Sequence, residues 1–564
     1  MQYAATIFIA VLGLGLAAVP AARAQADWVL HNAQIYTVSA EQPEAEALAI
    51  RGDRILMVGS DDDVLGTYPD ARRVDAQGRT VVPGLIDAHA HLMGLGESLI
   101  QVDLVGTASK QEIRDRLEDF AQDLPAGAWL TGRGWDQNDW PEQDFPTRAD
   151  LDDAFPDRPV WLTRIDGHAA WANTAALDAV GIDRLQSMDD PEGGTIVRDE
   201  NGRPTGVFID AAMGIVGQEV PDPSDAELDR ALELALQETA KYGLTGVHDA
   251  GADRATIQRY QRFIDADRFG LRVYAMIGGR GATFDHYCDA GPLPNYADRL
   301  AVRSVKFYID GALGSRGAAL LADYSDDPDN RGLLLQQPDA FQENVQAAMA
   351  CGFQVNTHAI GDRGNRIVLD AYEAAMERLG ATRGRHRVEH AQIVAPADIP
   401  RFAALDVIAS VQPTHATSDM YWAEDRLGHE RIEGAYAWRS LLDRGARLAL
   451  GSDFPVEQVD PLLGFYAAVT RQDGEGWPEG GWHPEERLTR HEALRGFTLD
   501  AAYSAFQEDD RGSLEPGKLA DFVILSQDIM EVRPEAILDT EVIATYLGGA
   551  PIYTRDGALP SAGQ

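Results

Sequence analysis

The chain has few positive charges, few lysines and few cysteines. Its 564 residues include 49 Lys and Arg against 90 Asp and Glu, so the formal net charge is −41. So acidic a chain is repelled by phosphate backbones and by anionic membrane surfaces, which argues against nucleic acid as a partner. Only four lysines occur, at positions 110, 241, 306 and 518. A lysine within an apolar segment is therefore an unusual feature here.

The two cysteines, Cys288 and Cys351, could pair in an oxidising compartment or remain as two buried thiols, and the sequence leaves both alternatives open. Near the N-terminus, an apolar run from Ala4 to Val19 is followed by Ala22-Arg23-Ala24. This pattern is typical of a secretory signal peptide, and the run is short for a spanning helix. We predict a signal peptide over residues 1–24, no stable membrane insertion after its cleavage, and a periplasmic or secreted mature protein.

Short alternating segments broken by Gly-Asp turns occur at both ends of the mature chain. They span residues 25–82 and return over residues 512–558. This alternation predicts antiparallel strands. Because neither piece is long enough to form a stable sandwich alone, we expect the two to pair into one small β-sandwich domain.

Between these ends, over residues 83–511, apolar strand patterns alternate with helical ones. Eight strands are expected, the first over residues 81–91 and the others over 246–249, 271–277, 305–309, 354–358, 387–390, 407–412 and 448–453. Such alternation predicts an α/β fold, a (β/α)8 TIM barrel, whose chemistry lies at the C-terminal ends of the strands. The stretch of about 92–241 is too long for one βα loop, and we interpret it as an inserted subdomain and a candidate lid.

Potential metal ligands end or interrupt five of these strands. His89 and His91 stand two residues apart, so both imidazoles project from one face of their strand. Taken alone, each later histidine is more often structural than a ligand, and an aspartate there could cap the next segment. Their joint occurrence at successive strand ends predicts a metal centre formed by His89, His91, Lys306, His358, His390 and Asp453.

Lys306 lies within the apolar segment Ser-Val-Lys-Phe-Tyr-Ile. It could be an edge-strand lysine, or it could form a salt bridge with Asp310. A functional interpretation is that burial lowers the pKa of the amine and keeps it neutral. A neutral amine can take up carbon dioxide as a carbamate, and this carboxylate-like group could bridge two cations.

Several motifs resemble the metal-dependent amidohydrolase superfamily: Pro-Gly-Leu-Ile-Asp-Ala-His-Ala-His (83–91), the strand-borne lysine, Gly-Ser-Asp-Phe-Pro (451–455) and Gly-Ser-Leu-Glu-Pro-Gly-Lys-Leu-Ala-Asp (512–521). Segments 132–136, 166–169, 305–311, 357–362 and 412–415 are similar to its amidohydrolase-3 branch, which includes N-substituted formamide deformylases. The resemblance covers nearly all of the mature chain.

This resemblance implies a centre with two metal ions, for which Zn²⁺ suits the imidazole and oxygen ligands. His89 and His91 would hold one ion, His358 and His390 the other, and carbamylated Lys306 would bridge them. Asp453 would touch the first ion, act as general base on the metal-activated hydroxide and pass its proton to the leaving amine. The implied reaction is hydrolysis of a non-peptide carbon–nitrogen bond, of amide or formamide type.

Four further residues are candidates for substrate contact: His168, Arg316, His415 and Trp135. Structural roles are open for each of them. Arg316 could bind an anionic group or fix its loop, and Trp135 could line an apolar pocket or pack a subdomain.

Three other functions stay open at this stage. A mononuclear aminohydrolase would need no bridging lysine, a lactonase or esterase would use the same metal chemistry, and a non-enzymatic periplasmic binding protein would need no complete ligand set. We expect a small-molecule, amide-like substrate as the partner. The oligomeric state is open, with a homodimer as one alternative.

Overall fold

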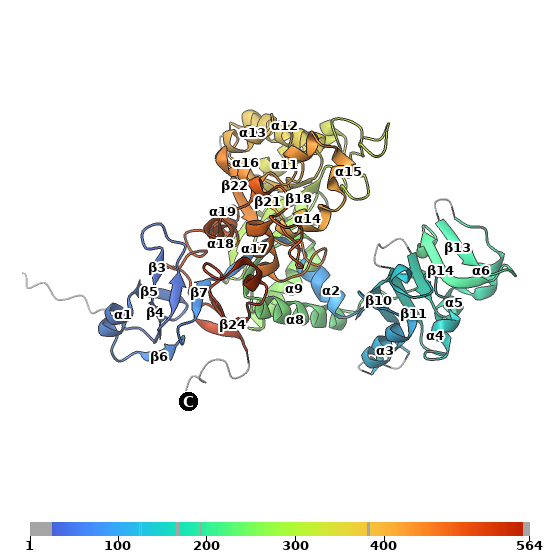
Figure 1. Ribbon diagram of the computed structural model, residues 1–564, viewed down its shortest axis with the longest axis horizontal. Helices are drawn as coiled ribbons and strands as arrows, with labels where there is room; N and C mark the ends of the chain where they lie inside the picture. Colours follow the sequence, from blue (N-terminus) through green and yellow to red (C-terminus); the bar gives the residue numbers. More distant parts are fainter. Residues whose placement is uncertain are drawn as a thin grey trace, which may run out of the picture.

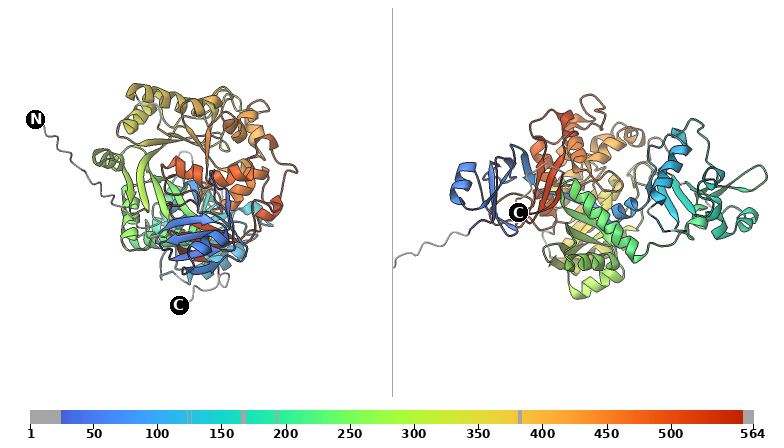
Figure 2. Two further views of the ribbon diagram at one scale, coloured as in Figure 1. Left: turned by 90° about the vertical axis from the view of Figure 1, so that its left-hand side faces the viewer. Right: turned by 90° about the horizontal axis from the view of Figure 1, so that it is seen from below.

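Three parts lie side by side in the computed structural model of the protein, which describes residues 25–555 apart from 123, 126, 165–168, 192–193 and 381–383. A barrel occupies the middle, strands from the chain ends lie on one side, and the insertion lies on the other (Figure 1). The view from below shows the same order (Figure 2). The predicted signal peptide, residues 1–24, lies outside the described residues.

The central sheet consists of eight parallel strands in sequence order, as predicted. They are β8 (Leu85–Ala90), β15 (Leu244–Ala252), β16 (Arg272–Gly278), β18 (Leu300–Tyr308), β19 (Gln354–Ala359), β20 (Arg387–His390), β21 (Ile408–Val411) and β22 (Arg447–Leu450). A short strand, β17 (Leu293–Tyr296), runs antiparallel to β18. The sheet nearly closes at the C-terminal ends of its strands, where the backbone N–H of Asp453 donates to the carbonyl of His89 at 2.8 Å.

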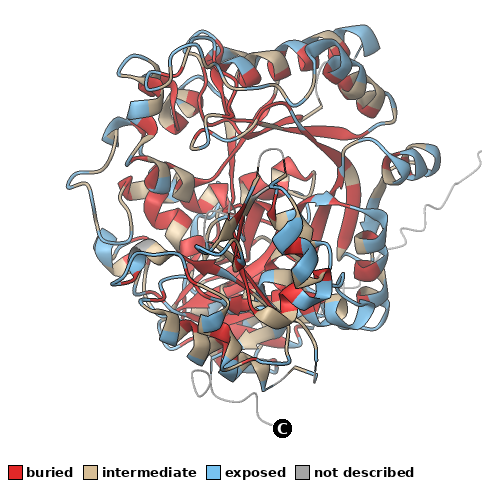
Figure 3. Cartoon of the chain, turned by 90° about the vertical axis from the view of Figure 1, so that its right-hand side faces the viewer, coloured by how far each residue is buried: buried red, intermediate tan, exposed pale blue. Residues whose placement is uncertain are grey.

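Both faces of these strands are covered, which explains their continuous apolar sequences. Every residue of β8, β20 and β21 is buried, and Figure 3 shows the contrast with the exposed outer faces of the helices. The surrounding helices include α8 (Asp225–Lys241), α9 (Arg254–Asp265), α10 (Ala282–Ala290), α11 (Pro338–Ala350), α12 (Asp362–Leu379), α13 (Ile399–Ala404), α16 (Trp438–Asp443), α17 (Pro461–Thr470), α18 (Arg490–Gly496) and α19 (Leu499–Ser504). The predicted (β/α)8 barrel is confirmed.

The two ends of the chain meet in one sheet. Strand β7 (Thr80–Pro83) pairs antiparallel with β23 (Phe522–Leu525), so that Val82 lies opposite Val523. This six-stranded sheet has the order β25-β24-β23-β7-β2-β3, with β2 (Gln34–Tyr36), β3 (Glu44–Ala45), β24 (Val542–Leu547) and β25 (Ala550–Thr554). A four-stranded sheet, β5-β4-β1-β6, packs beside it, with β1 (Trp28–His31), β4 (Ala47–Arg51), β5 (Arg54–Gly59) and β6 (Arg72–Asp75).

The insertion leaves the barrel directly after its first strand. Helix α2 (Leu92–Leu99) follows His91 and packs against α8. Beyond it lies a sheet of the order β13-β14-β12-β11-β10-β9, made of β9 (Val102–Asp103), β10 (Leu130–Trp135), β11 (Val160–Arg164), β12 (Ala169–Ala172), β13 (Gly194–Arg198) and β14 (Pro204–Asp210). Its own buried cluster, which includes three tryptophans, makes it a separately packed unit.

The two cysteines form a disulfide. Cys288 lies in α10 and Cys351 caps α11, with their Cα atoms 5.2 Å apart. The bond therefore ties together two neighbouring helices on the outside of the barrel. No helix within the described part of the chain is both long and apolar enough to cross a membrane.

Candidate metal centre

The first group of potential ligands forms where β8 and β22 end. The Asp453 carboxylate oxygen Oδ1 lies 3.2 Å from His91 Nε2 and 3.5 Å from His89 Nε2. One donor atom from each residue lies within 4.8 Å of the others. Three such donors around one point match the ligand number of a catalytic metal site.

A second group shares the same aspartate. Donor atoms of His390, His415 and Asp453 also lie within 4.8 Å of one another. The ring centre of His358 is 4.5 Å from that of His390. The Nε2 atoms of His358 and His415 are buried and have no hydrogen-bond partner among the described residues. Buried nitrogens without partners are costly, so these atoms fit a site that a cation completes.

The backbone is bent to bring two of these side chains inward. His390 has φ of 74° and Asp453 has φ of 65°, both in the left-handed region that non-glycine residues rarely adopt. His390 ends β20, and Asp453 lies three residues after Leu450, the last residue of β22. Such conformations cost about 1–3 kcal/mol and concentrate at functional sites.

Lys306 is buried in the middle of the sheet, not at an edge. Its strand, β18, pairs with β16 on one side and β19 on the other. The Asp310 carboxylate instead accepts three backbone hydrogen bonds, from Ala319, Ile360 and Gly361. Among the described residues Lys306 forms no ion pair, and its Nζ lies 3.0 Å from His89 Nε2. Neither the edge-strand nor the salt-bridge interpretation of Lys306 is therefore correct.

Burial controls the charge of the centre. It lowers the pKa of Lys306 to about 8, and together with the Lys306 charge it lowers the pKa of His89 to about 4. Burial also lowers the pKa of His358 to about 3. The pKa of Asp453 is held well below its usual value, because the hydrogen bond from His91 and the charges of nearby histidines outweigh its burial. The hydrogen bond and charge of Asp453 raise the pKa of His91 despite its burial. Neutral imidazoles at His89 and His358 beside the ionised Asp453 are protonation states that bind metal ions.

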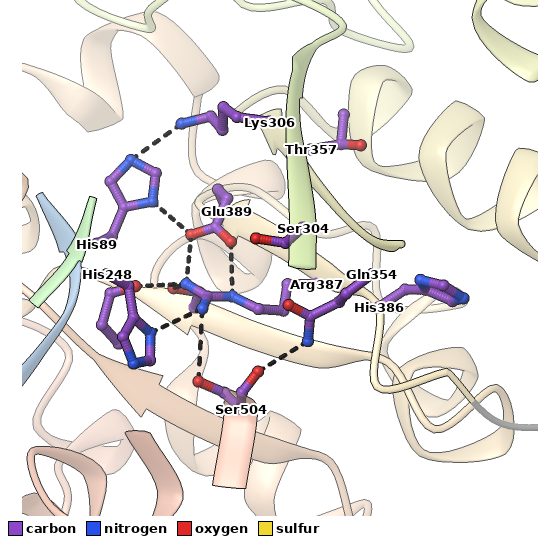
Figure 4. Close-up of polar contacts among 12 residues, drawn as sticks. His89, His248, Ser304, Lys306, Gln354, Thr357, His386, Arg387, Glu389 and Ser504 are labelled. Carbon is purple, nitrogen blue, oxygen red and sulfur yellow. Dashed lines mark hydrogen bonds and ion pairs between the residues drawn. The ribbon is translucent and has the colours of Figure 1, made fainter. Parts of the chain in front are cut away.

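Three buried residues that sequence reasoning missed stand behind His89 (Figure 4). The Glu389 carboxylate contacts His89 Nδ1 through Oε2 and Arg387 Nε through Oε1, the latter at 2.7 Å. Arg387 Nη1 lies 2.9 Å from His248 Nδ1. One pattern in the sequence could have indicated them: Arg387 and Glu389 carry opposite charges two residues apart in the apolar strand Arg-Val-Glu-His. Charged side chains within a buried strand need specific partners.

A pocket of about 420 Å³ opens onto the centre. It is lined by all six predicted metal ligands and by further residues at this end of the barrel, among them Tyr308, Leu313, Ile360, His415, Trp422, Val456 and Glu457. Its exposed surface is largely apolar, but Asp419 and Glu457 also line it, and no arginine does so among the described residues. None of the described residues of the insertion belongs to this lining, and a role of the insertion as a lid stays a prediction.

The four candidate substrate contacts lie in different places. His415 lines the pocket, and His168 lies outside the described residues. Trp135 is fully buried within the insertion and donates from Nε1 to the carbonyl of Leu162 at 2.8 Å. Arg316 forms an ion pair with Asp326 at 2.8 Å and is not part of the pocket lining. Substrate contact by any of the four stays a prediction.

The class of protein follows from comparison with known sequences. Residues 72–553 match the model of the amidohydrolase family. The chain therefore belongs to that family, in its amidohydrolase-3 branch, as the motifs predict.

Relatives align along nearly the whole chain. Protein LONG AFTER FAR-RED 3 from Arabidopsis thaliana is 38% identical, over 95% of this chain and 93% of its own. Putative amidohydrolase YtcJ from Bacillus subtilis is 33% identical, over 93% and 99%. N-substituted formamide deformylase from Arthrobacter pascens is 30% identical, over 94% and 99%.

A solved structure shows the same fold. An uncharacterized metal-dependent hydrolase from Pyrococcus furiosus superposes with a TM-score of 0.74 at 28% identity, covering 89% of this chain and all of its own. With the clustered histidines and aspartate, these likenesses define the protein as a metal-dependent hydrolase of the amidohydrolase family.

Proposed function

We propose that the protein hydrolyses the carbon–nitrogen bond of a small non-peptide amide, using two Zn²⁺ ions. The observation that carries this proposal is the convergence of His89, His91, His358, His390 and Asp453 on one pocket around the buried Lys306. The ions would activate the attacking water and polarise the substrate carbonyl. His89 and His91 would hold the first ion, and His358 and His390 the second.

Lys306 would join the two positions as a carbamate. Its amine is buried, forms no ion pair among the described residues and has a pKa lowered to about 8 by burial. A larger fraction of such an amine is neutral near pH 7 than of an exposed lysine. Carbamylation turns this lone cation into an anion, which suits a position between two metal ions better than an ammonium does.

Asp453 would act as the general base. It lies between the two groups of donors, and its carboxylate stays ionised because its pKa is low. It would accept the proton of the attacking water and deliver it to the leaving amine. The nearby His415, whose Nε2 lies 3.8 Å from Asp453 Oδ2, would orient the substrate or the carboxylate.

The pocket favours neutral amides with an apolar group. Tyr308, Leu313, Ile360 and Trp422 supply apolar surface, while Arg316 is held by Asp326 and no arginine lines the pocket in the part of the chain that the structure describes. A formamide with an apolar N-substituent meets this description, and one relative is named for that activity. N-acyl amines and lactones are the alternatives to compare with it.

Export is the corresponding proposal for location. The predicted signal peptide precedes Gln25, and a disulfide is favoured in the periplasm or outside the cell.

Metal removal and replacement test the proposed chemistry. A chelator should abolish hydrolysis of N-formyl and N-acyl amines, and Zn²⁺ should restore it, because the ions activate the water. Lys306→Ala should lose at least about 100-fold in kcat, and short carboxylic acids should restore part of it by occupying the place of the carbamate. Full activity of Lys306→Ala with one ion per chain would instead support a mononuclear aminohydrolase.

A further inference from the structure

The Nδ1 atoms of His89 and His390, two candidate ligands, contact different groups. His89 presents Nδ1 to the Glu389 carboxylate, whereas His390 presents Nδ1 to the amide oxygen of Gln412 at 2.8 Å. In both cases the acceptor fixes the proton on Nδ1, so Nε2 carries the lone pair that a metal ion would take; in His89 this Nε2 lies 3.0 Å from Lys306 Nζ. The difference is therefore one of charge: His89 is backed by an anion and His390 by a neutral dipole.

The carboxylate behind His89 is itself held firmly. Glu389 and Arg387 side chains are both 0% exposed, and Arg387 Nε lies 2.7 Å from Glu389 Oε1. Arg387 Nη2 also donates to Ser410 Oγ at 2.8 Å. A buried ion pair of this kind contributes little net stability, because desolvation offsets its attraction. We interpret the Arg387–Glu389 ion pair as a positioning device, because it fixes the carboxylate that contacts the ring of His89.

We propose that the two metal positions are unequal in affinity, and that Glu389, positioned by Arg387, makes the His89 position the tighter one. A carboxylate hydrogen-bonded to a ligating imidazole raises the basicity of the ligand and restrains the orientation of its ring. Gln412 restrains the ring of His390 equally well but adds no charge. This inference rests on the proposed two-metal centre.

The proposal predicts which residue changes which dissociation constant. Apoprotein titrated with Zn²⁺ against a chromophoric chelator should show two constants. Glu389→Gln should weaken the tighter one about 10–100-fold and leave the weaker one unchanged. Gln412→Glu, the reciprocal change, should tighten the weaker one. A His390→Asn background should retain only the tighter constant, on which Glu389→Gln should still act.

Glu486→Gln provides the matched control. Glu486 is also a buried carboxylate, bound to the backbone N–H of Ser440 at 3.0 Å, but it contacts none of the ligands. This variant should keep both constants. The visible spectrum of the Co²⁺-loaded protein should change with Glu389→Gln and not with Glu486→Gln. Only Glu389 contacts a proposed metal ligand, the imidazole of His89.

Two results with the variants would overturn the inference. One is that Glu389→Gln leaves both constants unchanged or weakens only the weaker one, and the other is that Gln412→Glu leaves the weaker one unchanged. A wild-type protein that binds a single ion at saturating Zn²⁺ would overturn it as well. If two Zn²⁺ ions bind with unequal dissociation constants but no amide is hydrolysed, the proposed reaction is refuted and the inference about the two positions stands. Failure of the inference and failure of the proposed function can therefore be told apart.

Discussion

At the scale of single residues, the centre depends on polar groups that are buried without ordinary partners. Lys306 forms no ion pair among the described residues, and the Nε2 atoms of His358 and His415 have no hydrogen-bond partner there. Each is a liability to folding unless a ligand compensates it. Burial of these polar groups lowers the stability of the fold, and bound metal ions would compensate this loss.

The structure offers two candidates, His358 and His415, for the second ligand beside His390. The resemblance to the family assigns His358, whereas the donors of His415 lie within 4.8 Å of those of His390 and Asp453. We expect His358→Ala to reduce bound Zn²⁺ from two ions per chain to one. His415→Ala should keep both ions and lower kcat at least about tenfold, since it loses only a substrate or base contact. Elemental analysis of dialysed protein decides between them, and the opposite pattern would make His415 the ligand.

At the scale of elements, the barrel is joined to the terminal sheets by a buried ion pair. Arg272 in β16 forms two hydrogen bonds with Asp521, which directly precedes β23, at 2.7 and 2.8 Å. The two side chains are 5% and 4% exposed. The charge of Arg272 and its hydrogen bonds hold the pKa of Asp521 below its usual value despite burial.

Loss of the Arg272–Asp521 ion pair should lower the free energy of unfolding substantially. Asp521→Ala leaves the Arg272 charge buried and unpaired, so the free energy of unfolding should fall by about 3–5 kcal/mol. Chemical denaturation measures this loss. The exposed pair Arg54–Asp510, with side chains 40% and 58% exposed, is the control. Asp510→Ala should cost less than about 1 kcal/mol, and equal losses for both variants would contradict the prediction.

The same pair has a consequence for acid stability. Since the pKa of Asp521 is lower in the folded state than in the unfolded chain, the pair stabilises the fold above the unfolded value of 3.8. That contribution is lost as the pH falls from there through the folded pKa.

At the scale of the whole molecule, the insertion and the catalytic barrel are distinct packing units. The insertion begins beside the candidate metal ligands, but none of its described residues lines the pocket. Its Trp135 stacks on Trp140 at 6.0 Å between ring centres and contacts Trp171 edge-on. The tryptophans therefore form the core of this unit.

Trp135→Ala tests whether stability and catalysis are separable. Removing this ring should cost about 3–5 kcal/mol of local stability through the cavity it leaves. Limited proteolysis should then cleave the insertion first, while bound metal and KM for small amides stay at wild-type values. A several-fold rise in KM with intact folding would show instead that the ring contributes to substrate binding.

Much of this protein could be predicted from local pattern. Alternation of apolar strands with helices predicts a parallel sheet covered by helices, which buries such strands on both faces, and the number of eight strands favours a barrel. The His-x-His pair and the later ligands could be located for the same reason, since parallel strands bring their C-terminal ends to one rim. The pairing of the chain ends followed from their being too short to form a sheet alone.

The tertiary structure alone decided what depends on contacts between distant residues. Glu389 lies 300 positions from His89, so no local spacing could reveal that one orients the other. Likewise, Arg316 is held by Asp326, and Trp135 is enclosed by its own subdomain. Sequence periodicity specifies which side of an element is buried, whereas the partner met there depends on how the whole chain packs. The His-x-His strand thus marked the candidate metal centre from the sequence, and only the fold showed that His89 is backed by a carboxylate and His390 by a neutral amide.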